Sequence, residues 1–223
     1  MKSVLLVHGA WHGSWCWDLI VPRLEVLGIN VVTIDLPFNG FDNDVLAVSE
    51  LIDSIEDDLI VLGHSYGGMV ISEATQAKPN VKQLIYLCAI LLKEGENVNG
   101  DEEKSRPSKI RIEVDEDLNS IVKKDAIIPA FYEDVAIDIT EKYLGKLRNF
   151  PINSISTGRG EAWKEIETTY VVCGKDSAID PERQREMAEL ADSILEWDCG
   201  HSPFFSNPDI LCSLLFESAK NSC

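Results

Sequence analysis

Apolar residues gather in short continuous runs, which alternate with segments whose apolar positions have helical spacing. Continuous apolar runs are typical of strands that are buried on both faces of a parallel sheet. The predicted strands lie at 3–7, 30–35, 58–62, 81–87, 168–173 and 193–197. The predicted helices lie at 17–27, 44–55, 69–77, 181–191 and 208–218. This alternation predicts an α/β fold with an open, mostly parallel sheet of about six strands and helices on both faces.

One segment, 92–162, interrupts the alternation. Residues 93–124 are charged and poor in aromatic residues, and 94–117 are strongly acidic. Residues 127–150 are more apolar and have helical spacing. The segment is too long for an ordinary connection. We therefore predict a single domain over 1–223 with a small cap or lid inserted at 92–162.

The charge balance is acidic, with 20 basic and 38 acidic residues and a net charge of −18. Such a surface argues against nucleic acid and anionic membranes as partners, and it keeps a protein in solution. It also favours a neutral or cationic small molecule over a polyanion as substrate. No stretch is long enough to span a bilayer. The chain opens Met-Lys-Ser and runs directly into a strand without the features of a signal peptide, so we expect a cytoplasmic location.

The six cysteines show no paired CxxC spacing, so no zinc site is expected. Cys88 and Cys173 stand in apolar strand-like runs, which predicts that they are buried free thiols.

The pattern Gly63-x-Ser65-x-Gly67 stands between the strand at 58–62 and the helix at 69–77. Glycines at these positions permit a sharp strand-to-helix turn with close crossing of the backbone. The serine hydroxyl is then exposed at the top of the sheet, and the N-terminal end of the helix favours a developing negative charge. Ser65 is therefore the predicted nucleophile.

A serine hydroxyl needs a base, and in this arrangement the acid and then the histidine follow the serine along the chain. Only His201 comes after Ser65, directly beyond the strand at 193–197. The other histidines are His8, His12 and His64, and we expect their rings to hydrogen-bond the backbone of the tight loops in which they stand.

Two aspartates compete for the role of the acid. Asp176 is the first aspartate after the strand at 168–173. Asp180 directly precedes Pro181, where an aspartate is well explained as the N-cap of a helix. We therefore predict Asp176 as the partner of His201.

Acyl transfer also needs two amide donors for its oxyanion. One is expected to be the N–H of Tyr66, directly after the nucleophile, and the other the N–H of Ala10 in the loop after the first strand. Trp11 is a candidate for lining the pocket. Further candidate lining residues in the insertion are Phe131, Tyr132 and Leu144.

Several of these segments resemble the α/β-hydrolase superfamily, and more narrowly its small esterase branch with plant methylesterases, hydroxynitrile lyases and bacterial carboxylesterases. The segments are His8-Gly9-Ala10-Trp11-His12-Gly13-Ser14-Trp15-Cys16-Trp17, Gly63-His64-Ser65-Tyr66-Gly67-Gly68, Tyr170-Val171-Val172-Cys173-Gly174-Lys175-Asp176 and Gly200-His201-Ser202-Pro203-Phe204. The resemblance covers the chain outside the charged part of the insertion. It implies Ser65 as nucleophile, His201 as general base and then acid, Asp176 as the orienting carboxylate, and the Ala10 and Tyr66 amides as the oxyanion hole.

The implied activity is that of a serine carboxylesterase acting on a small neutral ester, without metal or organic cofactor. The lyase members carry a threonine where Gly9 stands and a lysine directly after the catalytic histidine, where this chain has Ser202. A lyase on the same fold and a non-catalytic ligand-binding protein are the alternatives. An intact set at Ser65, Asp176 and His201 argues against the non-catalytic protein.

Overall fold

The computed structural model describes residues 2–98, 107–152 and 157–220, and it contains a six-stranded parallel sheet. The strand order is β2-β1-β3-β4-β8-β9. The strands are β1 (Ser3–Val7), β2 (Val31–Ile34), β3 (Leu59–His64), β4 (Val81–Leu87), β8 (Glu167–Cys173) and β9 (Ser193–Trp197). The six predicted strands and the predicted parallel sheet are confirmed.

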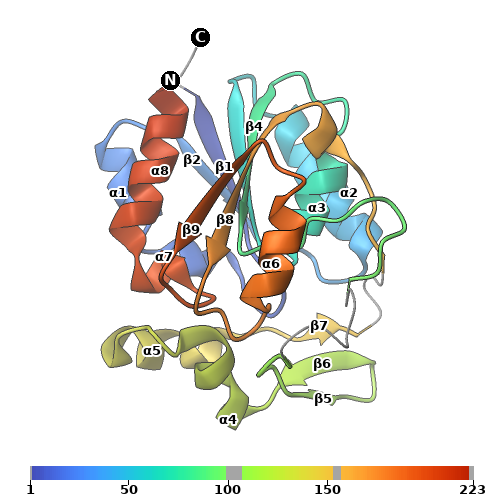
Figure 1. Ribbon diagram of the computed structural model, residues 1–223, viewed down its shortest axis with the longest axis vertical. Coiled ribbons are helices and arrows are strands. Elements are labelled where there is room, and N and C mark those ends of the chain that lie inside the picture. The colour runs from blue at the N-terminus through green and yellow to red at the C-terminus, as the bar shows by residue number, and fades with distance from the viewer. Residues whose placement is uncertain (1, 99–106, 153–156, 221–223) are drawn as a thin grey trace.

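Helices cover both faces of this sheet (Figure 1). They are α1 (Val21–Val26), α2 (Phe41–Asp53), α3 (Gly67–Ala74), α6 (Pro181–Ala188), α7 (Pro203–Ser206) and α8 (Pro208–Lys220). The strand β1 shows why its apolar run is continuous: Val4 and Leu6 belong to the core under α1 and α8, while Leu5 and Val7 belong to the core under α2, α3 and α6. Because side chains alternate along a strand, a strand buried on both faces needs apolar residues at every position.

The helix predicted over 17–27 is shorter in the structure. A 3₁₀ turn occupies Ser14–Trp17, and α1 begins only at Val21. Pro22 stands in the first turn of α1, where its missing N–H costs no helical hydrogen bond, so the helix begins there.

The predicted insertion folds into a small antiparallel sheet and several short helices, which lie beyond the carboxyl ends of the main strands (Figure 1). Its strands are β5 (Ile112–Val114), β6 (Asn119–Val122) and β7 (Phe150–Pro151). Its helices are α4 (Lys124–Ile127), a π-helical turn at Ile128–Tyr132, α5 (Ile137–Tyr143) and a 3₁₀ turn at Leu144–Lys146. A further 3₁₀ turn at Ala162–Lys164, where the predicted segment ends, packs instead against α3 and β8. Residues 99–106 of the predicted acidic segment lie outside the described residues.

The longest helices, α2 and α8, have 13 residues each. Across the described ranges, no helix combines the length and the apolar character needed to cross a membrane.

The five cysteines within the described ranges are buried and free, which confirms the prediction for Cys88 and Cys173.

Candidate active site

Ser65 stands at the predicted sharp turn between β3 and α3. Its φ of 52° lies in the left-handed region, which is strained for a residue with a side chain. A Cβ atom on Gly63 would lie 2.7 Å from the carbonyl oxygen of Gly67, and a Cβ on Gly67 would lie 2.7 Å from that of Val7. Both glycines are therefore required by the close crossing of the backbone. The side chain of Ser65 is held at the end of β3, where it is partly exposed.

Asp176 and His201 are hydrogen-bonded and buried. The Nδ1–H of His201 donates to Oδ2 of Asp176 over 2.6 Å. The other carboxylate oxygen, Oδ1, accepts the amides of Ala178 and Ile179 over 2.7 and 2.9 Å. Asp180 instead caps α6, where its side chain accepts the amide of Glu182 over 3.3 Å. The structure therefore pairs Asp176 with His201. Because the carboxylate binds Nδ1 of the imidazole, the Nε2 side of the ring stays available.

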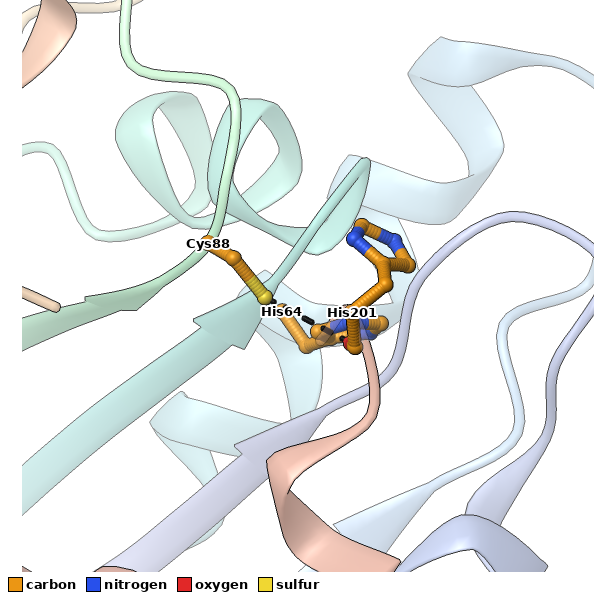
Figure 2. Close-up of side chains that lie close together, drawn as sticks. All are labelled: His64, Cys88 and His201. Atoms are coloured by element: carbon orange, nitrogen blue, oxygen red, sulfur yellow. Dashed lines mark hydrogen bonds between the residues drawn. The ribbon is translucent and has the colours of Figure 1, made fainter. Parts of the chain in front are cut away.

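His201 also lies against the turn that carries Ser65. Its ring centroid is 4.7 Å from that of His64, the residue before the serine. Figure 2 shows the ring of His64 and the thiol of Cys88 converging on the backbone of His201. Within the part of the chain that the structure describes, the Ser65 hydroxyl makes no hydrogen bond. Bonds between a nucleophile and its base are often long without substrate and tighten in the reacting complex.

The loop after β1 packs directly on Ser65. A Cβ atom on Gly9 would lie 2.8 Å from Cβ of Ser65, so Gly9 permits this approach. The next residue along the loop is Ala10, the predicted amide donor. Among the described residues, the amides of Ala10 and Tyr66 have no backbone acceptor, so both N–H groups can bind an anion.

A buried carboxylate that the sequence reasoning did not identify holds the side chain of Tyr66. The Tyr66 hydroxyl donates to Oδ2 of Asp44 over 2.7 Å, and the amide of Phe38 donates to Oδ1 over 2.8 Å. Burial raises the pKa of Asp44, although both hydrogen bonds act against the shift. The bond to Asp44 thus fixes the side chain of Tyr66, whose backbone amide is the predicted oxyanion donor.

His8 and His12 bond the backbone of the loop after β1, as predicted. The Nδ1–H of His8 donates to the carbonyl of Gly9, and the Nδ1–H of His12 donates to that of Ala10, each over 2.9 Å. Burial lowers the pKa of His8 to about 4 and that of His12 to about 3. Both rings are neutral near pH 7, and they stabilise the loop without acting as bases.

The four candidate lining residues take different positions. The ring of Phe131 lies 5.7 Å from that of His201 and 6.0 Å from that of Trp11. Trp11 donates its indole N–H to Oγ of Ser120 in β6 over 3.0 Å, which ties the loop after β1 to the insertion.

The other two candidates have contacts away from Ser65. Tyr132 is buried, with its hydroxyl 3.2 Å from Nε2 of His12 and its ring 6.0 Å from that of Phe205. Leu144 is partly buried against the core cluster that contains Tyr132. Of the four candidates, Phe131 therefore lies against His201, and Trp11 lies next to Phe131.

One cluster has side chains that could ligate a metal ion. The ligand atoms of His64, Cys88 and His201 lie within 4.8 Å of one another, a grouping unique among the described residues. Each of the three also has a hydrogen-bonding role in the site, since His201 binds Asp176 while His64 and Cys88 bind the carbonyl of His201.

Comparison with known proteins identifies the family. The profile of the alpha/beta hydrolase family matches residues 4–214. The chain is 28% identical to the alpha/beta hydrolase nvfD of Aspergillus novofumigatus, over 97% of this chain and 96% of that protein. It is 26% identical to methylesterase 3 of Arabidopsis thaliana, over 98% of this chain and 96% of that protein.

Solved structures agree on the fold. Polyneuridine aldehyde esterase superposes with a TM-score of 0.83 at 19% identity, over 99% of this chain and 100% of that chain. Tomato methylketone synthase I, in complex with 2-tridecanone, superposes with a TM-score of 0.84 at 21% identity, over 98% of this chain and 97% of that chain. The elbow at Ser65, the parallel sheet and the family match lead to one conclusion: this chain belongs to the alpha/beta hydrolase family.

Proposed function

We propose that the protein is a serine carboxylesterase that hydrolyses a small neutral ester through an acyl-enzyme. The observation that carries the proposal is the 2.6 Å hydrogen bond between Asp176 and His201, placed beside the turn that presents Ser65. A carboxylate on Nδ1 fixes the imidazole with Nε2 unprotonated, which is the form that accepts a proton from a serine.

In this mechanism His201 takes the proton of Ser65 as the hydroxyl oxygen attacks the ester carbonyl. The negative oxygen of the tetrahedral intermediate binds the amides of Ala10 and Tyr66. His201 then gives its proton to the leaving alcohol, and the acyl group stays on Ser65. Water, deprotonated by His201, attacks the carbonyl of the acyl-enzyme. The bond to Ser65 then breaks, the acid leaves, and His201 returns the proton to the Ser65 oxygen. No step requires a metal or an organic cofactor.

The related proteins support an ester as substrate, because several of them are named methylesterases. The site supports an ester over a cyanohydrin for a second reason. A side chain in place of Gly9 would meet Ser65 within 2.8 Å, and Ser202, directly after His201, is fully buried and brings no charged amine. The buried free cysteines are consistent with a reducing compartment such as the cytoplasm.

The test is hydrolysis of a panel of small methyl and p-nitrophenyl esters of increasing acyl length. We expect the wild-type protein to turn over short neutral esters, and Ser65→Ala to lose this turnover while it keeps its fold by circular dichroism. Ser54→Ala, at the end of α2, is the matched control and should behave like the wild type.

Turnover that persists in Ser65→Ala would refute the mechanism. Cyanide release from cyanohydrins without ester turnover would favour the lyase, and binding without turnover would favour the non-catalytic protein.

A further inference from the structure

The carbonyl of His201 accepts two side-chain donors, one from the elbow and one from the residue directly after β4. The Nε2–H of His64 donates over 2.9 Å, and the thiol of Cys88 donates over 3.5 Å (Figure 2). A carbonyl oxygen can only accept, so the proton of His64 is on Nε2 and its Nδ1 is bare. That Nδ1 atom is buried and has no hydrogen-bond partner in the described part of the chain. The hydrogen bond to His201 is therefore the only one that the ring of His64 makes there.

The two donors are fixed relative to the nucleophile. His64 is covalently joined to Ser65, and the amide of Ser65 donates to the carbonyl of Leu87, the residue before Cys88. The carbonyl of Ser65 in turn accepts the amide of Ile90 over 3.0 Å. The last residue of β4 and the segment after it thus bind the backbone of Ser65, and the same segment carries the second donor, Cys88. His64 and Cys88 are both fully buried.

We propose that His64 is a positioning residue that fixes the backbone of His201 relative to Ser65, with Cys88 as a weaker second donor. This proposal rests on the proposed function. Asp176 holds His201 by its side chain, and His64 holds it by its main chain. Two attachment points, one at each end of the residue, determine where Nε2 stands. Because a thiol is a weak donor, most of the effect comes from His64.

The position of the donor atom provides the test. In His64→Gln the amide nitrogen can occupy the place of Nε2, whereas in His64→Asn it lies nearer the place of Nδ1 and does not reach the carbonyl of His201. We expect His64→Leu and His64→Asn to lower kcat by about 10- to 100-fold with little change in KM, since small displacements of a catalytic group have effects of this size. His64→Gln should recover most of kcat, and Cys88→Ala should lose less than His64→Leu.

Ile52→Val, a core truncation in α2 away from the site, controls for loss of stability and should keep kcat. Equal kcat in His64→Gln and His64→Asn would overturn the proposal. So would a rise in KM at unchanged kcat in His64→Asn. These two polar variants also keep the test decisive if His64→Leu does not fold.

A readout independent of turnover is the low-field proton resonance of the hydrogen bond between Asp176 and His201. This resonance should shift or broaden in His64→Asn, and in His64→Gln it should keep the position and width that it has in the wild-type protein. If the wild-type protein hydrolyses no ester, the proposed function fails, while this resonance still tests the positioning by His64. An identical resonance in the wild-type protein and in His64→Asn would contradict it.

Discussion

The side-chain amide of Gln184 donates to Oδ2 of Asp176 over 2.8 Å, and the same carboxylate oxygen accepts Nδ1–H of His201 over 2.6 Å. Gln184 is fully buried on α6, and its carbonyl oxygen accepts the amide of Cys173 at the end of β8 over 2.9 Å. It therefore links the acid to both the sheet and the helix, and the position of Asp176 depends on it.

Replacing Gln184 by Met keeps the length of the side chain and removes these two hydrogen bonds together with a third, from the side-chain amide to the carbonyl of Ile179 over 2.9 Å. We expect kcat/KM to fall by about 10-fold because the carboxylate loses an orienting donor, and the free energy of unfolding to fall by about 1–3 kcal/mol because the amide of Cys173 is left unpaired. Steady-state kinetics and urea unfolding measure the two effects. Unchanged kcat/KM in a stably folded variant would show that Asp176 does not need this donor.

Gly9→Ala places a methyl group where the structure has no room for it. The added Cβ would lie 2.8 Å from Cβ of Ser65 and 2.9 Å from Nδ1 of His64, so the loop or the elbow must shift. We expect kcat to fall by at least about 10-fold, since both Ser65, the proposed nucleophile, and the Ala10 amide are displaced. Gly145→Ala, where an added Cβ meets no atom within 4 Å, is the control and should keep kcat. Equal kcat in the two variants would contradict this packing.

Tyr66→Phe removes the hydroxyl that donates to the buried carboxylate of Asp44. The free energy of unfolding should fall by about 1–3 kcal/mol, because one oxygen of a buried acid loses its donor. Tyr86→Phe is the matched control, since that buried hydroxyl bonds the neutral hydroxyl of Ser72 over 2.8 Å. Its loss should be smaller. Chemical denaturation of both variants measures the two losses. A larger loss in Tyr86→Phe would contradict the greater cost expected when the buried carboxyl of Asp44 loses its donor.

The buried histidines predict a specific loss of stability in acid. The folded-state pKa of His12 is lowered from 6.5 to about 3 by burial, so the unfolded chain binds its proton first. The stability that depends on this neutral ring is complete above about pH 6.5 and is lost as the pH falls towards about 3. His8 behaves in the same way down to about pH 4.

His12→Asn keeps a donor for the carbonyl of Ala10 and removes the titrating group. Between the two pKa values of His12, the slope of unfolding free energy against pH should be smaller in the variant by about 1.4 kcal/mol per pH unit, the value for one proton. Urea titrations at several pH values measure the slope. An unchanged slope would mean that the ring of His12 does not stay neutral in the folded protein.

Local patterns in the sequence were sufficient to predict the sheet, the turn at Ser65 and the pairing of Asp176 with His201. The turn around Ser65 follows from its glycines, and the choice of Asp176 over Asp180 follows from the proline after Asp180. Each of these inferences depends only on residues that are close along the chain, so hydrophobic periodicity and turn-forming residues are enough to make it.

The partners of the site residues could not be predicted in this way. Gln184 reaches Asp176 from a helix, Asp44 reaches Tyr66 from α2, and His64 bonds a carbonyl 137 positions further along the chain. Nothing in their local pattern distinguishes them from surface glutamine, a helix-start aspartate or a loop histidine. Tertiary packing alone brings them together, and the same holds for Tyr132, whose hydroxyl faces His12.

Labelling with a fluorophosphonate tests the central claim, that Ser65 is a nucleophile activated by His201, most directly. The probe forms a covalent bond only with an activated serine, so mass spectrometry of the digested protein should find one adduct, on the peptide containing Ser65. Labelling should be absent in Ser65→Ala and strongly slowed in His201→Ala. An adduct at another residue, or labelling that persists in Ser65→Ala, would contradict the account.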